Sequence, residues 1–134
     1  MEHNIDYRVS MVENFHGEFE HSIDPKKRVT IPTSYRHQII ERLKLHDYPD
    51  FLANSVCIVP MTNHVKIYDA LGYERKSKDL DPISKLLTYT HVNKQGRVLI
   101  PDNCRRIFEK YSQVLITPSP DLDSIMVIPF KTPQ

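Results

Sequence analysis

The chain has 134 residues and a mass of 15.7 kDa, with 40% hydrophobic and 26% charged residues, an ordinary composition for a globular protein. Its formal net charge of +1 and pI of about 7.8 argue against a generic nucleic-acid binder, whose domain pI usually exceeds about 9. No apolar run approaches the roughly 20 residues that span a bilayer, and the first residues lack a secretory signal pattern, so we expect no membrane segment.

Residues 1–16 show weak periodicity and are expected to form an N-terminal extension. Met11 is a candidate alternative start, which would make residues 1–10 a mobile tail. The intact mass of protein made from the native gene tests this expectation, because a sole species beginning at Met1 would contradict it.

The first half of the chain, residues 17–68, begins with a predicted strand, a tight turn and a second strand. Residues 19–23 and 28–31 alternate between apolar and polar side chains, which is typical of half-buried strands. The segment between them, Asp24-Pro25-Lys26-Lys27, has the composition of a tight turn. Pro32 then opens a segment with helical spacing, and proline is favoured in the first turn of a helix. A second strand pair is predicted at 56–60 and 65–68.

A connector, residues 69–87, follows. Asp69 is suited to cap a short helix that begins at Ala70. The mixed charges of residues 74–79 indicate a solvated face, and Asp81-Pro82 indicates the start of a further short helix over 83–87. Residues 44–50 are expected to form a surface loop, because Pro49 discourages continuation of the preceding helix.

The second half, residues 88–130, repeats the first. A shift of 69 positions places Arg28 on Arg97 and Pro32 on Pro101, and the turn then corresponds to Asn93-Lys94-Gln95-Gly96. Strands are predicted at 114–118 and 125–129, with a helix after Pro101. Such a repeat indicates two copies of one supersecondary unit, strand-turn-strand, helix, strand-turn-strand.

Basic residues gather around the two predicted turns, in windows 26–42 and 94–110. A local patch of this kind steers DNA more than total charge does. The windows contain Lys26, Lys27, Arg28, Arg36, Arg42, Lys94, Arg97, Arg105, Arg106 and Lys110.

The motif from Gly17 to Arg28 with Ile31-Pro32, and its second copy from Asn93 to Pro101, resemble the SpoVT-AbrB DNA-binding domain. Their tandem arrangement resembles the MraZ family of bacterial transcriptional regulators, over most of the chain. The resemblance implies an α+β, mainly β fold in which two intertwined repeats form a swapped-hairpin (double-psi-like) β-barrel with short helices. It also implies double-stranded DNA at promoter repeats as the partner and a ring-like homo-oligomer. A cytoplasmic, nucleoid-associated location follows from the same resemblance.

The resemblance implies DNA contact by Lys26, Lys27, Arg28, Lys94 and Arg97. Each of these is also explained as a charged turn residue that is merely solvated or that pins its own turn. The family pattern usually has Gly before the Arg and Asp at the start of the turn. Here Lys27 replaces that Gly in the first copy, and Asn93 replaces that Asp in the second. Since asparagine cannot form an ion pair, we expect Arg97 to be held less firmly than Arg28.

Asp24, Asn93 and Gly96 are expected to stabilise the turns. Arg36, Arg105 and Arg106 lie on the predicted helices, where structural or subunit contacts compete with DNA contact as their role.

An enzymatic function is not expected. The seven histidines show no zinc-type spacing, and the chain contains no GxSxG, P-loop or GxGxxG motif. Cys57 and Cys104 occupy apolar positions and read as buried hydrophobes in a reduced, cytosolic protein. The sequence therefore predicts no catalytic residue, metal or cofactor. The alternative function is a protein-interaction module, antitoxin-like or scaffold, that uses the same barrel.

Overall fold

A computed structural model describes residues 15–79 and 89–131 of the chain. Within these ranges the fold is α+β and mainly β, which confirms the predicted class. In chain order the elements are β1 (Phe19–Ser22), β2 (Arg28–Thr30), α2 (Thr33–Leu45), η1 (a 3-10 helix, Asp50–Asn54), β3 (Ser55–Pro60), β4 (Val65–Tyr68), α3 (Ala70–Lys76), η2 (a 3-10 helix, Ser77–Asp79), β5 (Thr90–His91), β6 (Arg97–Leu99), α4 (Asp102–Phe108), β7 (Gln113–Pro118) and β8 (Ile125–Lys131).

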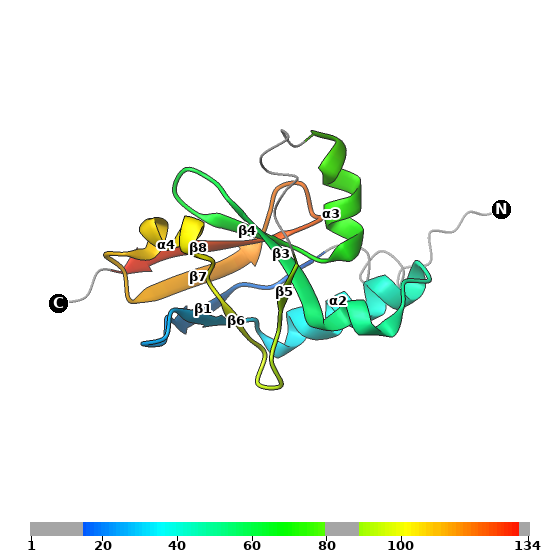
Figure 1. Cartoon of the computed structure of the whole chain (residues 1–134), viewed down its shortest axis with the longest axis horizontal. Coiled ribbons are helices and arrows are strands. Elements are labelled where there is room, and N and C mark those ends of the chain that lie inside the picture. The colour runs from blue at the N-terminus through cyan, green and yellow to red at the C-terminus, as the bar shows by residue number, and fades with distance from the viewer. Residues whose placement is uncertain (1–14, 80–88, 132–134) are drawn as a thin grey trace.

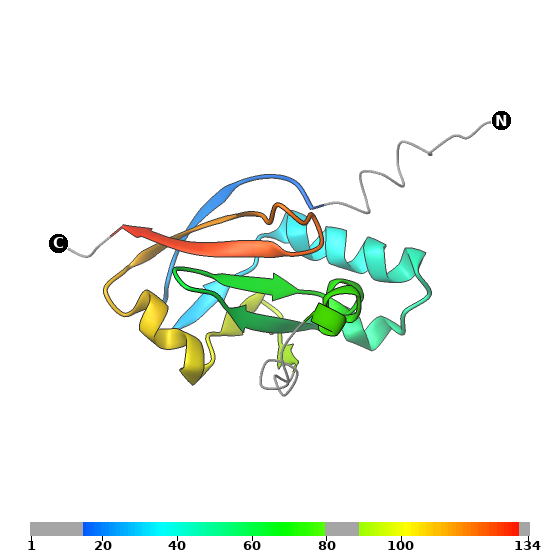
Figure 2. The same cartoon turned by 90° about the horizontal axis from the view of Figure 1, so that it is seen from above.

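The strands form a curled antiparallel sheet and a separate ribbon. The sheet has the order β1-β7-β8-β4-β3-β5, and the ribbon consists of β2 and β6 (Figure 2). Helices α2 and α3 lie at one end of the molecule and α4 at the other (Figure 1). Strands from the two sequence halves pair with each other, because β1 lies beside β7, β5 beside β3, and β4 beside β8.

The core fills the space between the sheet, the ribbon and α2. Tyr35 is completely buried, and its hydroxyl donates a hydrogen bond to the carbonyl oxygen of Gly17. The rings of Phe15 and Phe19 meet the Tyr35 ring edge-on, at centroid distances of 5.9 and 5.4 Å. Burial of these rings packs the start of α2 against β1.

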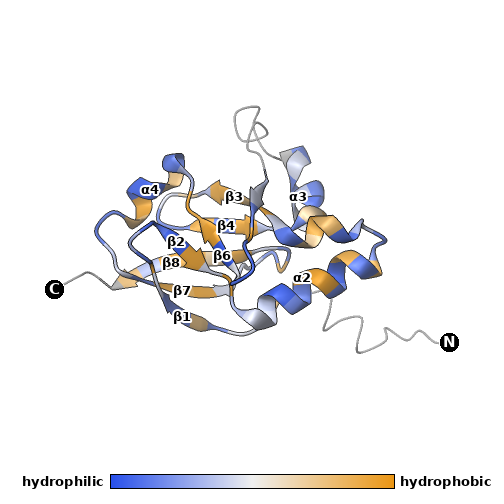
Figure 3. Cartoon of the chain, turned by 60° about the horizontal axis from the view of Figure 1, so that its bottom comes forward, coloured by the Kyte–Doolittle hydropathy of each residue, from blue (hydrophilic) through white to orange (hydrophobic). Residues whose placement is uncertain are grey.

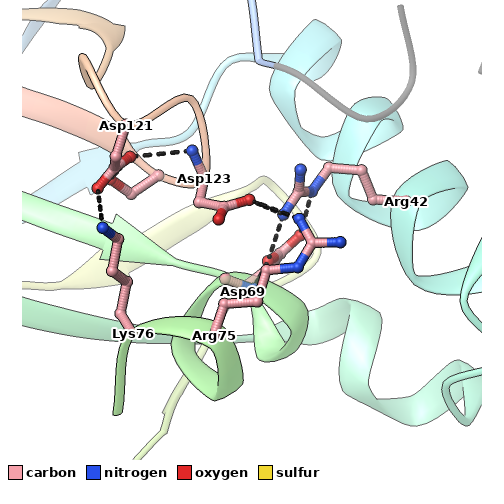
Figure 4. A network of polar contacts seen from close by, with 8 residues as sticks. Arg42, Asp69, Arg75, Lys76, Asp121 and Asp123 are labelled. Atoms are coloured by element: carbon pink, nitrogen blue, oxygen red, sulfur yellow. Dashed lines mark hydrogen bonds and ion pairs between the residues drawn. The ribbon is translucent and has the colours of Figure 1, made fainter. Parts of the chain in front are cut away.

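A buried ion-pair network joins α2 to α3 and to the turn between β7 and β8 (Figure 4). Arg42 is fully buried, and its Nε lies 2.9 Å from Asp69 Oδ2. Arg42 Nη2 also reaches Asp123 Oδ1 at 3.4 Å, and Arg75 Nη1 contacts the same oxygen at 2.9 Å. Asp69 also caps α3, as predicted, because its Oδ1 accepts the Gly72 N–H at 2.8 Å.

This network corrects the interpretation of Arg42 and adds ion pairs to that of residues 74–79. Arg42 falls within the basic window 26–42, but it is enclosed in the core and offers no charge to a surface ligand. The predicted solvated face over 74–79 is confirmed for Glu74, Arg75 and Lys78, which are exposed. Arg75 nevertheless pairs with Asp123, and Lys76 Nζ lies 3.8 Å from Asp121 Oδ2. Part of this segment therefore joins α3 to the β7–β8 turn.

The expected loop over 44–50 is shorter than predicted. Helix α2 continues to Leu45, and η1 begins at Asp50, so only residues 46–49 are irregular. The predicted helix over 83–87, its Asp81-Pro82 cap and the Met11 start lie outside the described residues. Among the helices in the described part of the chain, none is long and apolar enough to cross a membrane.

Candidate nucleic-acid interface

The first basic turn, residues 24–28, is closed by Asp24. Its carbonyl oxygen accepts the Lys27 N–H at 2.9 Å, and its Oδ1 accepts the Arg28 N–H at 2.7 Å. Its Oδ2 accepts the Arg28 Nε–H, also at 2.7 Å. One carboxylate therefore orders both the turn and the arginine side chain, and it leaves the two terminal amino groups of Arg28 without a partner among the described residues.

The Asp24 carboxylate is charged at neutral pH. Partial desolvation acts to raise its pKa, but the hydrogen bonds and the charge of Arg28 outweigh this and lower the pKa below the ordinary value of 3.8. The pair with Arg28 is thus an ion pair at neutral pH, and it holds the guanidinium in a charge-assisted hydrogen bond.

The second basic turn, residues 93–97, has the same backbone hydrogen-bond pattern but does not hold its arginine side chain in the same way. The Asn93 carbonyl oxygen accepts the Gly96 N–H at 2.9 Å, and Asn93 Oδ1 accepts the N–H groups of Gln95 and Arg97 at 3.0 and 2.9 Å. Within the described ranges the exposed Arg97 guanidinium has no hydrogen-bond partner. Asn93 reproduces the backbone role of Asp24 here but makes no hydrogen bond to the arginine side chain.

The residue before each arginine has a left-handed backbone, with φ of 62° at Lys27 and 81° at Gly96. Glycine adopts this conformation without strain, whereas a residue with a Cβ does so at a cost. Gly96 is also crowded, because a Cβ at this position would lie 2.6 Å from Arg36 Nε. The guanidinium of Arg36, from the first half of the chain, thus packs against the turn of the second half.

The β2–β6 ribbon joins the two turns. Its central pair is Val29 opposite Val98, and both side chains are buried. Since side chains alternate along a strand, Arg28 and Arg97 project from the opposite, outer face of the ribbon. They occupy diagonal positions, and such residues in antiparallel strands lie about 7–8 Å apart. The ribbon lies on the face turned to the viewer in Figure 3 (Figure 3).

The remaining sequence-predicted basic residues fall into two groups. Lys26, Lys27 and Lys94 are exposed at the tips of the turns. Arg105 is half-buried, and it donates to the Ile100 carbonyl oxygen at 3.2 Å and pairs with Asp102 Oδ1 at 3.0 Å. Arg106 is exposed on α4 and lines a shallow pocket beside Tyr111 and Pro129. Among the described residues, the unpaired basic groups therefore lie mainly on the turns, with Arg106 on α4 as a further one.

Other reactive side chains show no comparable arrangement. Cys57 and Cys104 are free thiols and are buried, and burial raises the pKa of each to about 11. Across residues 15–79 and 89–131, no group of three or more His, Cys, Asp or Glu side chains is placed to hold a metal ion.

Sequence reasoning missed two features of this surface. It did not foresee that the Arg36 guanidinium lies against Gly96, or that β2 and β6 pair directly. The only available signal was the repeat itself, because two short strands of one repeated unit can satisfy their backbone groups by pairing with each other.

The chain is similar to two curated relatives. Transcriptional regulator MraZ of Acetivibrio thermocellus is 30% identical over 95 residues, which cover 68% of this chain and 65% of that protein. Transcriptional regulator MraZ of Leuconostoc mesenteroides subsp. mesenteroides is 25% identical over 108 residues, which cover 77% and 73%. The match thus spans just under two thirds of the first relative's length. No family model matches the chain.

Proposed function

Since this chain is a distant relative of the MraZ transcriptional regulators, we propose that it is itself a transcriptional regulator that binds double-stranded DNA in a sequence-specific manner. The observation that carries the proposal is that two basic turns flank one ribbon, with Arg28 and Arg97 on the same outer face. A protein with modest total charge can bind DNA when its basic groups are gathered in this way.

The proposed contacts divide by chemistry. Lys26, Lys27 and Lys94 are compact charges at exposed turn tips, which suits contact with phosphates. Arg28 and Arg97 carry planar forks of donors, which suit either a phosphate or the O6 and N7 atoms of guanine. Asp24, Asn93 and Gly96 would position these side chains through the turn geometry. Arg36 would support the second turn through its packing against Gly96.

The proposed architecture is a swapped-hairpin barrel made of two SpoVT-AbrB-like repeats, residues 17–68 and 88–130, with an extension at 1–16 and a connector at 69–87. It is supported by the strand pairing, in which the first strand of each half pairs with the third strand of the other half. The β2–β6 ribbon supports the same relation, because equivalent strands of the two halves pair antiparallel there.

We also propose that the protein acts as a ring-like homo-oligomer on repeated promoter sites, in the cytoplasm and at the nucleoid. One ribbon offers few DNA contacts, so linked subunits would raise the overall affinity through effective concentration. Exposed aromatic side chains support self-association: Phe51 on η1 is 72% exposed, and Phe130 on β8 is 43% exposed.

Fluorescence anisotropy with labelled duplexes tests the proposed function. The DNA preceding the protein's own gene, and duplexes selected by the protein from a random pool, are compared with scrambled duplexes of equal composition. The single variants Arg28→Ala and Arg97→Ala and their combination are compared with Lys44→Ala, which removes one positive charge, as each single variant does, at the far end of α2.

The proposal predicts preference for the native or selected duplex, a large loss in the double arginine variant and little change in Lys44→Ala. Equal affinity for native, selected and scrambled DNA, or no binding by folded protein at low salt, would contradict it.

A further inference from the structure

The outer face of the β2–β6 ribbon carries two side chains besides the arginines, namely Thr30 and Leu99. In the register of the ribbon, Arg28 lies opposite Leu99, and Thr30 lies opposite Arg97. All four side chains point away from the buried Val29–Val98 pair. The outer face therefore carries four residues: the two arginines at one pair of diagonal positions, and Thr30 and Leu99 at the other pair.

The backbone hydrogen bonds bring these side chains close together. The Ile31 N–H donates to Gly96 O at 2.8 Å, and the Ile100 N–H donates to Lys27 O at 2.9 Å. These bonds make 31/96, 29/98 and 27/100 the hydrogen-bonded pairs of the ribbon. The pairs Arg28–Leu99 and Thr30–Arg97 are then non-hydrogen-bonded pairs, in which side chains stand closest, with Cβ atoms about 4.5–5.5 Å apart.

Leu99 is unusual for its surroundings. Its neighbours Val98 and Ile100 are 1% and 3% exposed, whereas Leu99 is 46% exposed beside charged turns. A single exposed leucine is common on protein surfaces. This one, however, lies directly opposite an arginine that is already ordered by Asp24, in the middle of the basic face.

Resting on the proposed DNA-binding function, we infer that Thr30 and Leu99 read bases when the β2–β6 ribbon lies in the major groove. A two-stranded ribbon fits this groove, which is about 12 Å wide. The C5-methyl group of thymine projects into the same groove and is recognised by apolar contact, which Leu99 supplies. Thr30 offers a methyl group for apolar contact and a hydroxyl that can donate or accept a hydrogen bond, so it can contact more kinds of base edge than Leu99 can.

The face is small, but its contacts to phosphates and its contacts to bases come from different side chains. Contacts to phosphates from the turn lysines carry no sequence information by themselves. Direct reading of base edges falls to side chains at the centre of the ribbon, and these are the two arginines with Thr30 and Leu99.

The two halves of the face are not equivalent in chemistry. Arg28 and Arg97 occupy matching positions in the repeat, but Thr30 matches Leu99. The two halves would therefore favour different bases, and the bound sequence would not be a perfect palindrome under one subunit.

The test uses the full chain and a duplex that the wild-type protein has selected from a random pool. Dissociation constants are measured for this duplex, for a scrambled duplex and for duplexes in which each thymine in turn is replaced by deoxyuridine, which lacks the methyl group. Leu99→Ala is compared with Leu45→Ala, a leucine of the same 46% exposure at the end of α2. Leu99→Thr, which copies the equivalent Thr30, provides a second variant, and thermal melting checks that each variant is folded.

The inference predicts that Leu99→Ala binds the selected duplex roughly three- to tenfold more weakly, as expected for the loss of one or two buried methyl groups, and that its affinity for scrambled DNA is unchanged. Removal of the methyl group of one particular thymine should weaken the wild type by a similar factor and should not weaken Leu99→Ala further. Leu45→Ala should behave as the wild type.

Two results would overturn the inference while leaving the proposed function intact. In one, the wild type prefers the selected duplex and both Leu99 variants keep that preference in full. In the other, Leu99→Ala loses affinity equally for selected and scrambled DNA, which would assign Leu99 a structural role. If the wild type shows no preference for any duplex, the sequence-specific function fails, and this inference fails with it.

Discussion

Arg28 and Arg97 should contribute unequally to DNA binding, although they occupy equivalent positions in the repeat. Arg28 Nε is held by Asp24 Oδ2 at 2.7 Å, whereas the Arg97 guanidinium has no partner within the described residues. Ordering a free arginine side chain costs up to about 2 kcal/mol of rotamer entropy. If Asp24 removes about half of this cost, Arg28→Ala should weaken binding by about 1 kcal/mol more than Arg97→Ala, or roughly fivefold in Kd.

The assay is anisotropy titration of the preferred duplex at one salt concentration, with both alanine variants. Asn93→Asp supplies the converse test, because a carboxylate at 93 can hold Arg97 as Asp24 holds Arg28. In that background the loss caused by Arg97→Ala should increase. Equal losses for the two arginines, a larger loss at Arg97, or an unchanged Arg97→Ala effect in Asn93→Asp would refute this reasoning.

Three further predictions concern stability. Lys27→Gly should raise the free energy of unfolding in urea by about 0.5–1 kcal/mol, because Lys27 has a φ of 62°; a decrease would contradict this. Asp69→Ala should lower it by about 3–5 kcal/mol, since it leaves Arg42 buried without its main partner. Arg75→Ala, which removes a partly exposed arginine, serves as the comparison. If Asp69→Ala lowers the free energy of unfolding no more than Arg75→Ala does, the reasoning about the buried ion pair is wrong. Burial and the charge of Lys66 lower the pKa of His64 below 6.5, so as the pH falls His64 is protonated in the unfolded chain before it is protonated in the folded protein. Stability should therefore fall as the pH drops below 6.5, and His64→Gln should reduce that dependence; parallel pH curves would show that His64 is not responsible.

The sequence predicts the local elements well because their signals are local. Alternation over residues 19–23 and 28–31, and the prolines before α2 and α4, depend only on neighbouring residues. The turns can be predicted in the same way, because the side chain of an Asp or Asn four residues before an Arg can accept the backbone N–H of that Arg. These signals place the basic side chains on turns.

The pairing of β2 with β6 could not be deduced in the same way. Alternation shows which face of a strand is buried, but it does not identify the partner strand about 70 residues away. The shared outer face of Arg28 and Arg97 depends on that pairing, and so does the contact of Arg36 with Gly96.

Arg42 shows a second limit of sequence reasoning. An apolar pattern would have put Ile40 in the core and left Arg42 in solvent, but Ile40 is 41% exposed and Arg42 is fully buried. The buried stripe of α2 includes Arg42 because Asp69, capping a helix far along the chain, neutralises it there. A charge is placed in a core only where a tertiary partner exists, and that partner is invisible in the local sequence.

The salt dependence of binding to the native or selected duplex tests the central claim most directly. If the two turns hold phosphates around a base-reading ribbon, log K should fall steeply and linearly with log salt, with a slope of about −0.9 per phosphate neutralised, and preference over scrambled DNA should persist. Replacing both Lys26 and Lys94 with alanine should make that slope shallower by about 2 without abolishing the preference. Folded protein that fails to bind at low salt, or that binds with a slope unchanged by these substitutions, would contradict the account.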